Sequence, residues 1–120
     1  MPFKKGKGRS QISQTDRNNV ILQRQEIEKL LDSENEIELK HAVMESDKLV
    51  DQVLKLKKYQ GETFADRLRS AENNIDRVLY DQIWQGHKVR NMLAHENGVR
   101  ISNQELKSAA GKLLNYAKQI

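Results

Sequence analysis

The chain lacks cysteine and has a single proline, Pro2, among its 120 residues. Without cysteine it can form no disulfide and no zinc or iron–sulfur site that depends on thiolates. Because proline is the residue that most strongly interrupts helices, nothing after position 2 forbids long ones. No apolar stretch approaches the roughly 18 residues of a membrane helix, and the basic N-terminus lacks the apolar run of a secretory signal. We therefore expect no membrane partner and a cytoplasmic location, with which the absence of cysteine is compatible.

Positive charge is concentrated at the N-terminus. The chain has 21 Lys and Arg against 17 Asp and Glu. Four of the basic residues lie in the first ten positions, where there is no acid, so residues 11–120 balance at 17 against 17. These four are Lys4, Lys5, Lys7 and Arg9. We expect residues 1–13 to be a flexible basic tail that binds RNA phosphates nonspecifically or only aids solubility, and residues 14–120 to be one domain.

The apolar residues recur with a helical period. A first helix is expected over about 16–32, and a second one begins at a capping box in which Ser33 caps and Glu36 reaches back. Gly61 is expected to end this second helix. The residues expected on its inward side recur at three- and four-residue steps; they are Leu39, Ala42, Val43, Ser46, Leu49, Val50, Val53 and Leu54. This pattern is typical of a helix packed in a bundle.

Three more helices are expected after Gly61. Thr63 and Asp66 form a variant capping box that starts a short helix, and a fourth helix spans about 75–95. Ser102 and Glu105 form a capping box that opens the last helix. No segment alternates as a strand does. We predict an all-α protein, an antiparallel four-helix bundle with an additional short helix.

The fourth expected helix displays two kinds of side chain. At about 100° per residue, its predicted core face collects Ile75, Val78, Leu79, Ile83, Val89, Met92 and Leu93. A second strip collects Tyr80, Trp84, His87, Asn91 and His95. Arg90 lies at the edge of that strip and Lys88 lies off it. One helix thus presents two imidazoles, a guanidinium, a carboxamide and an indole outside its predicted core face.

Those side chains suit the cleavage of RNA without a metal. RNA carries its own nucleophile, the 2′-hydroxyl, and a histidine that is neutral at pH 7 can take its proton. Arginine presents a planar fork of donors to phosphate oxygens, and Asn91 could orient the histidine or donate to the phosphate. Arg90 and His95 are five residues apart, about 140° around an ideal helix. They meet at one phosphate only if the helix frays near His95 or if two chains face each other.

The segment Arg90-Asn91-Met92-Leu93-Ala94-His95 resembles the motif of the HEPN superfamily, an arginine followed after four to six residues by a histidine. Further segments that look like a prokaryotic HEPN-like group are KHAVMESDKL (40–49), YQGETFADRL (59–68) and IWQGHKVRN (83–91). The resemblance covers residues 34–120. It implies an HEPN-like bundle that forms a homodimer with paired motifs at a cleft, often with metal-independent ribonuclease activity and no cofactor. Family members often act as toxins.

By this resemblance Arg90, Asn91 and His95 are the catalytic residues, and we expect His87 and Lys88 beside them to bind RNA together with the tail. The partners implied are RNA, a second copy, and an antitoxin or a nucleotidyltransferase. Glu96-Asn97 follows the histidine, so the tyrosine that some toxin members carry there is absent. The leading prediction is a metal-independent endoribonuclease. The alternative is a noncatalytic interaction or nucleotide-binding module of the same fold.

Purely structural roles are also open to these residues. Arg90 could pair with a carboxylate of the second helix, such as Asp47 or Glu45. Trp84 more often fills an interface than stacks on a base. Gly86 costs about 1 kcal/mol against alanine in mid-helix, which predicts the close approach of another helix and fits dimerisation.

Overall fold

The computed structural model describes residues 12–95 and 100–120, and over these residues the chain is helical without a strand. This confirms the predicted all-α class and the helical bundle. The elements are α1 (Gln14–Leu30), α2 (Glu36–Leu56), α3 (Phe64–Ser70), the 3₁₀ turn η3 (Glu72–Asn74), α4 (Arg77–His95) and α5 (Asn103–Ala117). The predicted tail falls mainly on residues 1–11, outside the described residues. Ser13 is the N-cap of α1, and its hydroxyl accepts from the Asp16 N–H at 3.0 Å.

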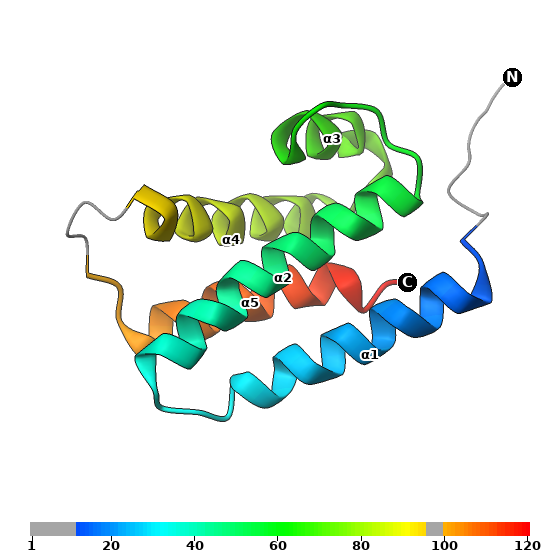
Figure 1. Ribbon diagram of the computed structural model, residues 1–120. Helices are drawn as coiled ribbons and strands as arrows, with labels where there is room; N and C mark the ends of the chain where they lie inside the picture. Colours follow the sequence, from blue (N-terminus) through cyan, green and yellow to red (C-terminus); the bar gives the residue numbers. More distant parts are fainter. Residues whose placement is uncertain (1–11, 96–99) are drawn as a thin grey trace, which may run out of the picture.

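The core lies along α2 and α5, which pack against each other over much of their length. Figure 1 shows α1 and α4 on opposite sides of this pair, with the chain reversing direction between successive long helices. The fully buried side chains of α2 and α5 include Leu39, Val43, Val50, Leu54, Leu106, Ala110 and Leu113. None of the helices in the described ranges has the length and apolarity to cross a membrane.

The start of α2 differs from the prediction. Asn35, not Ser33, is the N-cap: its side-chain oxygen accepts two backbone N–H groups at 2.9 and 3.1 Å. Ser33 Oγ accepts from the Asn35 N–H instead. Glu36 pairs with Lys40 at 2.9 Å rather than reaching back, and this bond lowers the pKa of Glu36. Serine and asparagine cap helices about equally well, so the sequence alone could not choose between them.

The end of α2 also differs, because the helix stops at Leu56 and not at Gly61. Lys58 has a φ of 70°, the left-handed conformation that often closes a helix and that usually falls to glycine. The N–H of Tyr59 donates to the Leu54 carbonyl at 3.1 Å, as the Schellman closure requires. Gly61 (φ 150°) follows in the turn that leads into α3.

The predicted N-caps of the later helices are confirmed, but Asp66 does not complete the predicted variant capping box, since its carboxylate accepts from Arg69 Nη1 at 3.4 Å instead. Thr63 Oγ1 accepts from the Asp66 N–H at 3.1 Å, which begins α3. Ser102 and Glu105 form a complete capping box on α5. The start of α4 at Arg77 is two residues later than predicted, since the Asp76 carboxylate accepts from the two backbone N–H groups of the first turn.

A bidentate ion pair holds α3 against α2. The Arg67 guanidinium donates to the two oxygens of Asp51 at 2.7 and 3.0 Å, and its third contact is the Gly61 carbonyl at 2.7 Å. The hydrogen bonds to Asp51 raise the pKa of the already basic Arg67. Arg67 is buried, and charged groups are found there only when they are paired in this way. The pair fixes the position of Phe64, at the start of α3.

Candidate functional site

The prediction of which residues of α4 face the core is partly wrong. Tyr80, expected outside the core, is only 5% exposed, whereas Val78, expected inside it, is 65% exposed. The buried Ile83 and Gly86 lie on the inward face with Tyr80. Apolar character alone favours burial of Val78, but the large ring of Tyr80 buries more area than the smaller Val78 side chain would.

Gly86 is explained by a helix of the same chain. A Cβ built there would lie 2.5 Å from Leu113 Cγ and 2.9 Å from the Ala109 carbonyl oxygen, both on α5. The predicted close approach of another helix is therefore confirmed, but that helix is α5. Gly86 gives no support to pairing between two copies.

The buried carboxylate of Asp47, at the centre of α2, contacts two predicted site residues of α4, His87 and Arg90. The Asp47 side chain is 8% exposed, with His87 Nδ1 2.8 Å from Oδ1 and Arg90 Nε 3.7 Å from Oδ2. Burying a carboxylate is costly unless it is paired and hydrogen-bonded, which explains why both partners turn toward it. We call Asp47, His87 and Arg90 the carboxylate cluster.

The His87 ring is held in one orientation. It stacks on Phe64 of α3 with ring centroids 4.0 Å apart and planes 3° from parallel, and Trp84 meets it edge-on at 6.1 Å. Its side chain is 13% exposed. Because Phe64 follows the position of α3, the imidazole depends on contacts from α2, α3 and α4 together.

Arg90 is only partly engaged. Its side chain is 36% exposed, and the 3.7 Å contact with Asp47 is too long for a strong hydrogen bond. Nη1 donates to Asn91 Oδ1 at 3.3 Å. Asp47 is one of the two carboxylates predicted as possible partners, whereas Glu45 lies 3.6 Å from Lys48. A guanidinium has five N–H donors, so Arg90 keeps several for a further acceptor.

The other predicted site residues lie apart from the carboxylate cluster. α4 remains helical as far as His95, its last residue, which is exposed, so the fraying considered above is not seen up to that point. Lys88 is exposed as well. The tail residues Lys4, Lys5, Lys7 and Arg9 are outside the described residues. The structure thus brings His87 and Asn91 to Arg90, while helix geometry keeps His95 about 140° around the axis from it.

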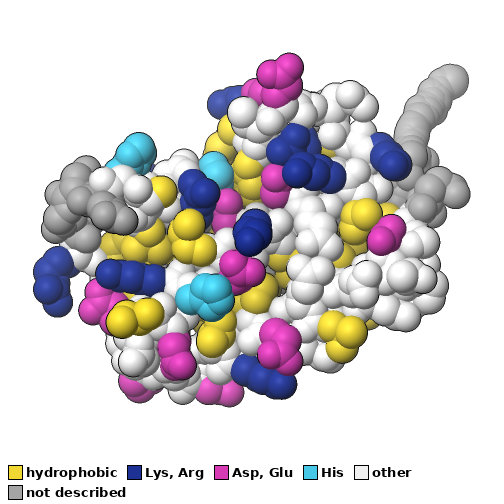
Figure 2. Space-filling model, viewed as in Figure 1, with side chains coloured by type: hydrophobic (Ala, Val, Ile, Leu, Met, Phe, Trp, Pro, Cys, Tyr) yellow, Lys and Arg dark blue, Asp and Glu magenta, His cyan; other side chains and the backbone are white. Residues whose placement is uncertain are grey.

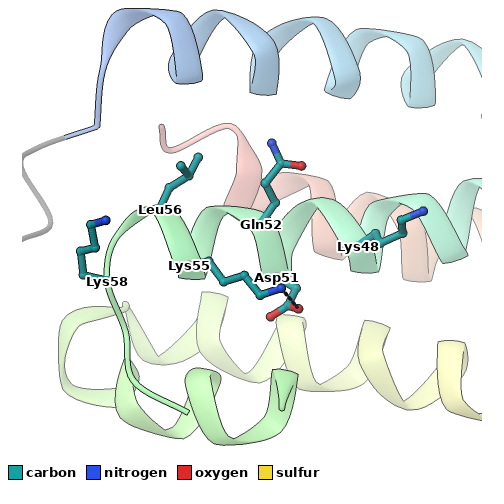
Figure 3. A pocket seen from close by; sticks show the side chains of 6 residues that line it. All are labelled: Lys48, Asp51, Gln52, Lys55, Leu56 and Lys58. Carbon is teal, nitrogen blue, oxygen red and sulfur yellow. Dashed lines mark ion pairs between the residues drawn. The ribbon is translucent and has the colours of Figure 1, made fainter. Parts of the chain in front are cut away.

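A basic hollow lies further along α2. Its volume is about 460 Å³. It is lined by Lys48, Asp51, Gln52, Lys55, Leu56 and Lys58. Figure 3 shows Lys55 reaching back to Asp51, 3.7 Å away. Because Asp51 is already bound by Arg67, the lysines of the hollow outweigh its acidic charge. Figure 2 shows Lys, Arg and His side chains spread among acidic ones over the face seen in Figure 1.

Asp47 is the residue whose importance the sequence did not reveal. The sequence predicts it only as a possible partner of Arg90. One signal was present: Asp47 falls four residues after Val43 and three before Val50, on the apolar stripe of its helix. A carboxylate at such a position is buried and must find donors.

Comparisons of the chain with protein-family models, curated proteins and solved structures find no match. Within residues 12–95 and 100–120, no three His, Asp or Glu side chains are grouped closely enough to hold a metal ion. The candidate site therefore consists of residues of α4 and of Asp47 behind them.

Proposed function

We propose that this protein is an HEPN-like, RNA-directed homodimer that cleaves RNA without a metal, using Arg90, Asn91 and His95. The observation that carries the proposal is the placement of Arg90: its Nε lies 3.7 Å from Asp47 Oδ2, and its side chain is 36% exposed and keeps Nη donors beside Asn91. His95 is exposed on the same continuous helix. The proposed HEPN arrangement uses α1, α2, α4 and α5 as its four antiparallel helices, with α3 as the additional short one.

The proposed chemistry uses the 2′-hydroxyl of the substrate as nucleophile. His95 takes the hydroxyl proton, the O2′–P bond forms, and the P–O5′ bond breaks as the leaving oxygen receives a proton from water. His95 then returns its proton to the solvent. The products are a 2′,3′-cyclic phosphate and a 5′-hydroxyl. Arg90 donates to the phosphate oxygens on which charge develops. Because one helix sets Arg90 and His95 about 140° apart, we place the two groups of each site in different chains.

The first test is cleavage of labelled single-stranded RNA in EDTA. Arg90→Ala and His95→Ala should each slow cleavage by at least about 100-fold, the usual effect of losing a general base or a charge-stabilising donor. Arg77→Ala and His41→Ala are matched controls, because both residues are exposed and lie away from the motif. Thermal melting should show that all four variants fold. Cleavage by both site variants at the wild-type rate would refute the assignment.

A noncatalytic interaction module is the second candidate, and the contact between Arg90 and Asp47 favours it, since a paired arginine can serve packing alone. Under this alternative no RNA is cleaved by any variant. Arg90→Ala then converts a dimer to a monomer in analytical ultracentrifugation, while Arg77→Ala leaves the dimer intact.

The basic tail is proposed to add nonspecific affinity for RNA. Each phosphate neutralised on a single strand contributes about 0.7 to the slope of log affinity against log salt. Changing Lys4, Lys5, Lys7 and Arg9 to Gln should therefore flatten that slope by up to about 3. The measurement is RNA binding at several salt concentrations, with the chain length unchanged as the internal control. A slope equal to that of the wild type would exclude the tail from binding.

A further inference from the structure

We propose that His87 and Arg90 of a single chain form a subsite for one ribose 3′-phosphate unit of RNA, with the imidazole facing the 2′-hydroxyl and the guanidinium facing the phosphate. The inference rests on the proposed function and adds to it an imidazole that lies outside the Arg-x4-His motif. The unit bound here is the neighbour of the one that is cleaved, so His87 and His95 accept from different 2′-hydroxyls, and the five N–H donors of Arg90 serve the two adjacent phosphates. It starts from the carboxylate cluster, where both side chains meet the same buried carboxylate.

Asp47 places the His87 imidazole and the Arg90 guanidinium side by side. His87 Nδ1 is 2.8 Å from one oxygen of this carboxylate, and Arg90 Nε is 3.7 Å from the other. The two residues are three apart on α4, so their side chains are neighbours on the helix surface. His95 is five residues from Arg90 and points elsewhere on the same helix. Within one chain, the imidazole next to Arg90 is therefore that of His87.

The bond to Asp47 also decides which ring nitrogen is left for a ligand. An Nδ1–H that donates to a carboxylate leaves Nε2 as the acceptor of the neutral ring. Among the described residues, Nε2 has no hydrogen-bond partner. Among these residues the buried polar atoms left without a partner are Ser46 Oγ and Tyr116 Oη, and the His87 side chain keeps 13% of its surface exposed. Stacking on Phe64 fixes the ring before a ligand arrives, which reduces the entropy lost on binding.

The chemistry of the pair matches a ribonucleotide. An imidazole acceptor suits a hydroxyl, and a guanidinium fork suits phosphate oxygens. Ribose carries its 2′-hydroxyl on the carbon next to the 3′-phosphate, and deoxyribose lacks that hydroxyl. The subsite should therefore bind ribose 3′-phosphates more tightly than deoxyribose 3′-phosphates, since the 2′-hydroxyl is the group that distinguishes RNA from DNA.

Proton NMR can test this directly, because the chain has three histidines and hence three ring Hε1 signals. The signals are assigned with His41→Asn, His87→Asn and His95→Asn. The full chain is titrated with adenosine 3′-monophosphate, with its 2′-deoxy analogue and with inorganic phosphate. The His87 signal should move saturably, and the ribonucleotide should bind about fivefold more tightly than the deoxynucleotide, as expected for one hydrogen bond.

A matched pair of variants separates the two ring nitrogens. In His87→Asn the amide occupies the place of Nδ1, so the bond to Asp47 is kept and Nε2 is lost. In His87→Gln the amide occupies the place of Nε2. The preference for the ribonucleotide should disappear in His87→Asn, be partly kept in His87→Gln, and be unchanged in His41→Asn, with the wild-type melting temperature of His87→Asn showing that Asp47 remains satisfied.

The inference is overturned if the His87 signal stays fixed while ligand saturates the protein, if only the His95 signal responds, or if His87→Asn keeps the full preference. RNA cleavage in EDTA is a separate readout. Cleavage that persists with an unresponsive His87 would remove the subsite and leave the proposed function. A responsive His87 in a protein without cleavage would support the subsite and remove the activity.

Discussion

Replacing Gly86 with alanine should destabilise the protein, whereas the same change at Gly111 should not. A Cβ at position 86 would lie 2.5 Å from Leu113 Cγ and 2.9 Å from the carbonyl oxygen of Ala109. A Cβ at Gly111 meets nothing within 4 Å. Both glycines are inside helices, so alanine gains about 1 kcal/mol of helix propensity at either site. The difference between the variants therefore reports the packing of α4 on α5.

Overpacking a tight interface typically costs about 1–3 kcal/mol. After the gain in propensity of about 1 kcal/mol, we expect Gly86→Ala to lower the free energy of unfolding by up to about 2 kcal/mol, and Gly111→Ala to raise it by up to about 1 kcal/mol. For a domain of this size, 1 kcal/mol moves the melting temperature by about 4 °C. Urea and thermal unfolding of the two variants measure both effects. Equal stability in the two would mean that α5 lies farther from α4 than the structure has it.

The fold could be predicted where burial follows a single stripe of residues. The predicted inward positions of α2 from Leu39 to Leu54 are all buried as expected, because a helix packed on two sides needs one broad apolar face. Helix ends were harder to predict. Ser33 and Asn35 are both good caps, and Lys58 takes a backbone conformation for which the sequence suggested Gly61. The outcome in each case depends on the path of the chain between helices.

Only the part of the candidate site that lies on a single helix could be predicted from the sequence. The order of Arg90, Asn91 and His95 along α4 follows from the helical period. The contact of His87 with Asp47 joins residues 40 apart, and it depends on how α4 rotates against α2. That rotation buries Tyr80 and exposes Val78, the reverse of what their apolar character suggested. Local periodicity carries no information on such a rotation when tyrosine and histidine also supply buried rings.

Mixing Arg90→Ala with His95→Ala should restore RNA cleavage that neither variant shows alone. α4 is helical as far as His95, so Arg90 and His95 of one chain point about 140° apart and are proposed to act on a shared phosphate only across a dimer. In a mixed dimer, one of the two sites then carries both substitutions and the other carries neither. Random exchange makes about half of the dimers mixed, so the mixture should recover about a quarter of the wild-type rate.

The control for this complementation is a mixture of either variant with the double variant, Arg90→Ala with His95→Ala, because that combination has no intact composite site. Subunit exchange is verified by mass spectrometry of a differently labelled pair. If exchange is complete and the mixture of single variants stays inactive, each site must draw its arginine and its histidine from the same chain. One helix could satisfy that requirement only by unwinding between Arg90 and His95, where the structure has an unbroken helix.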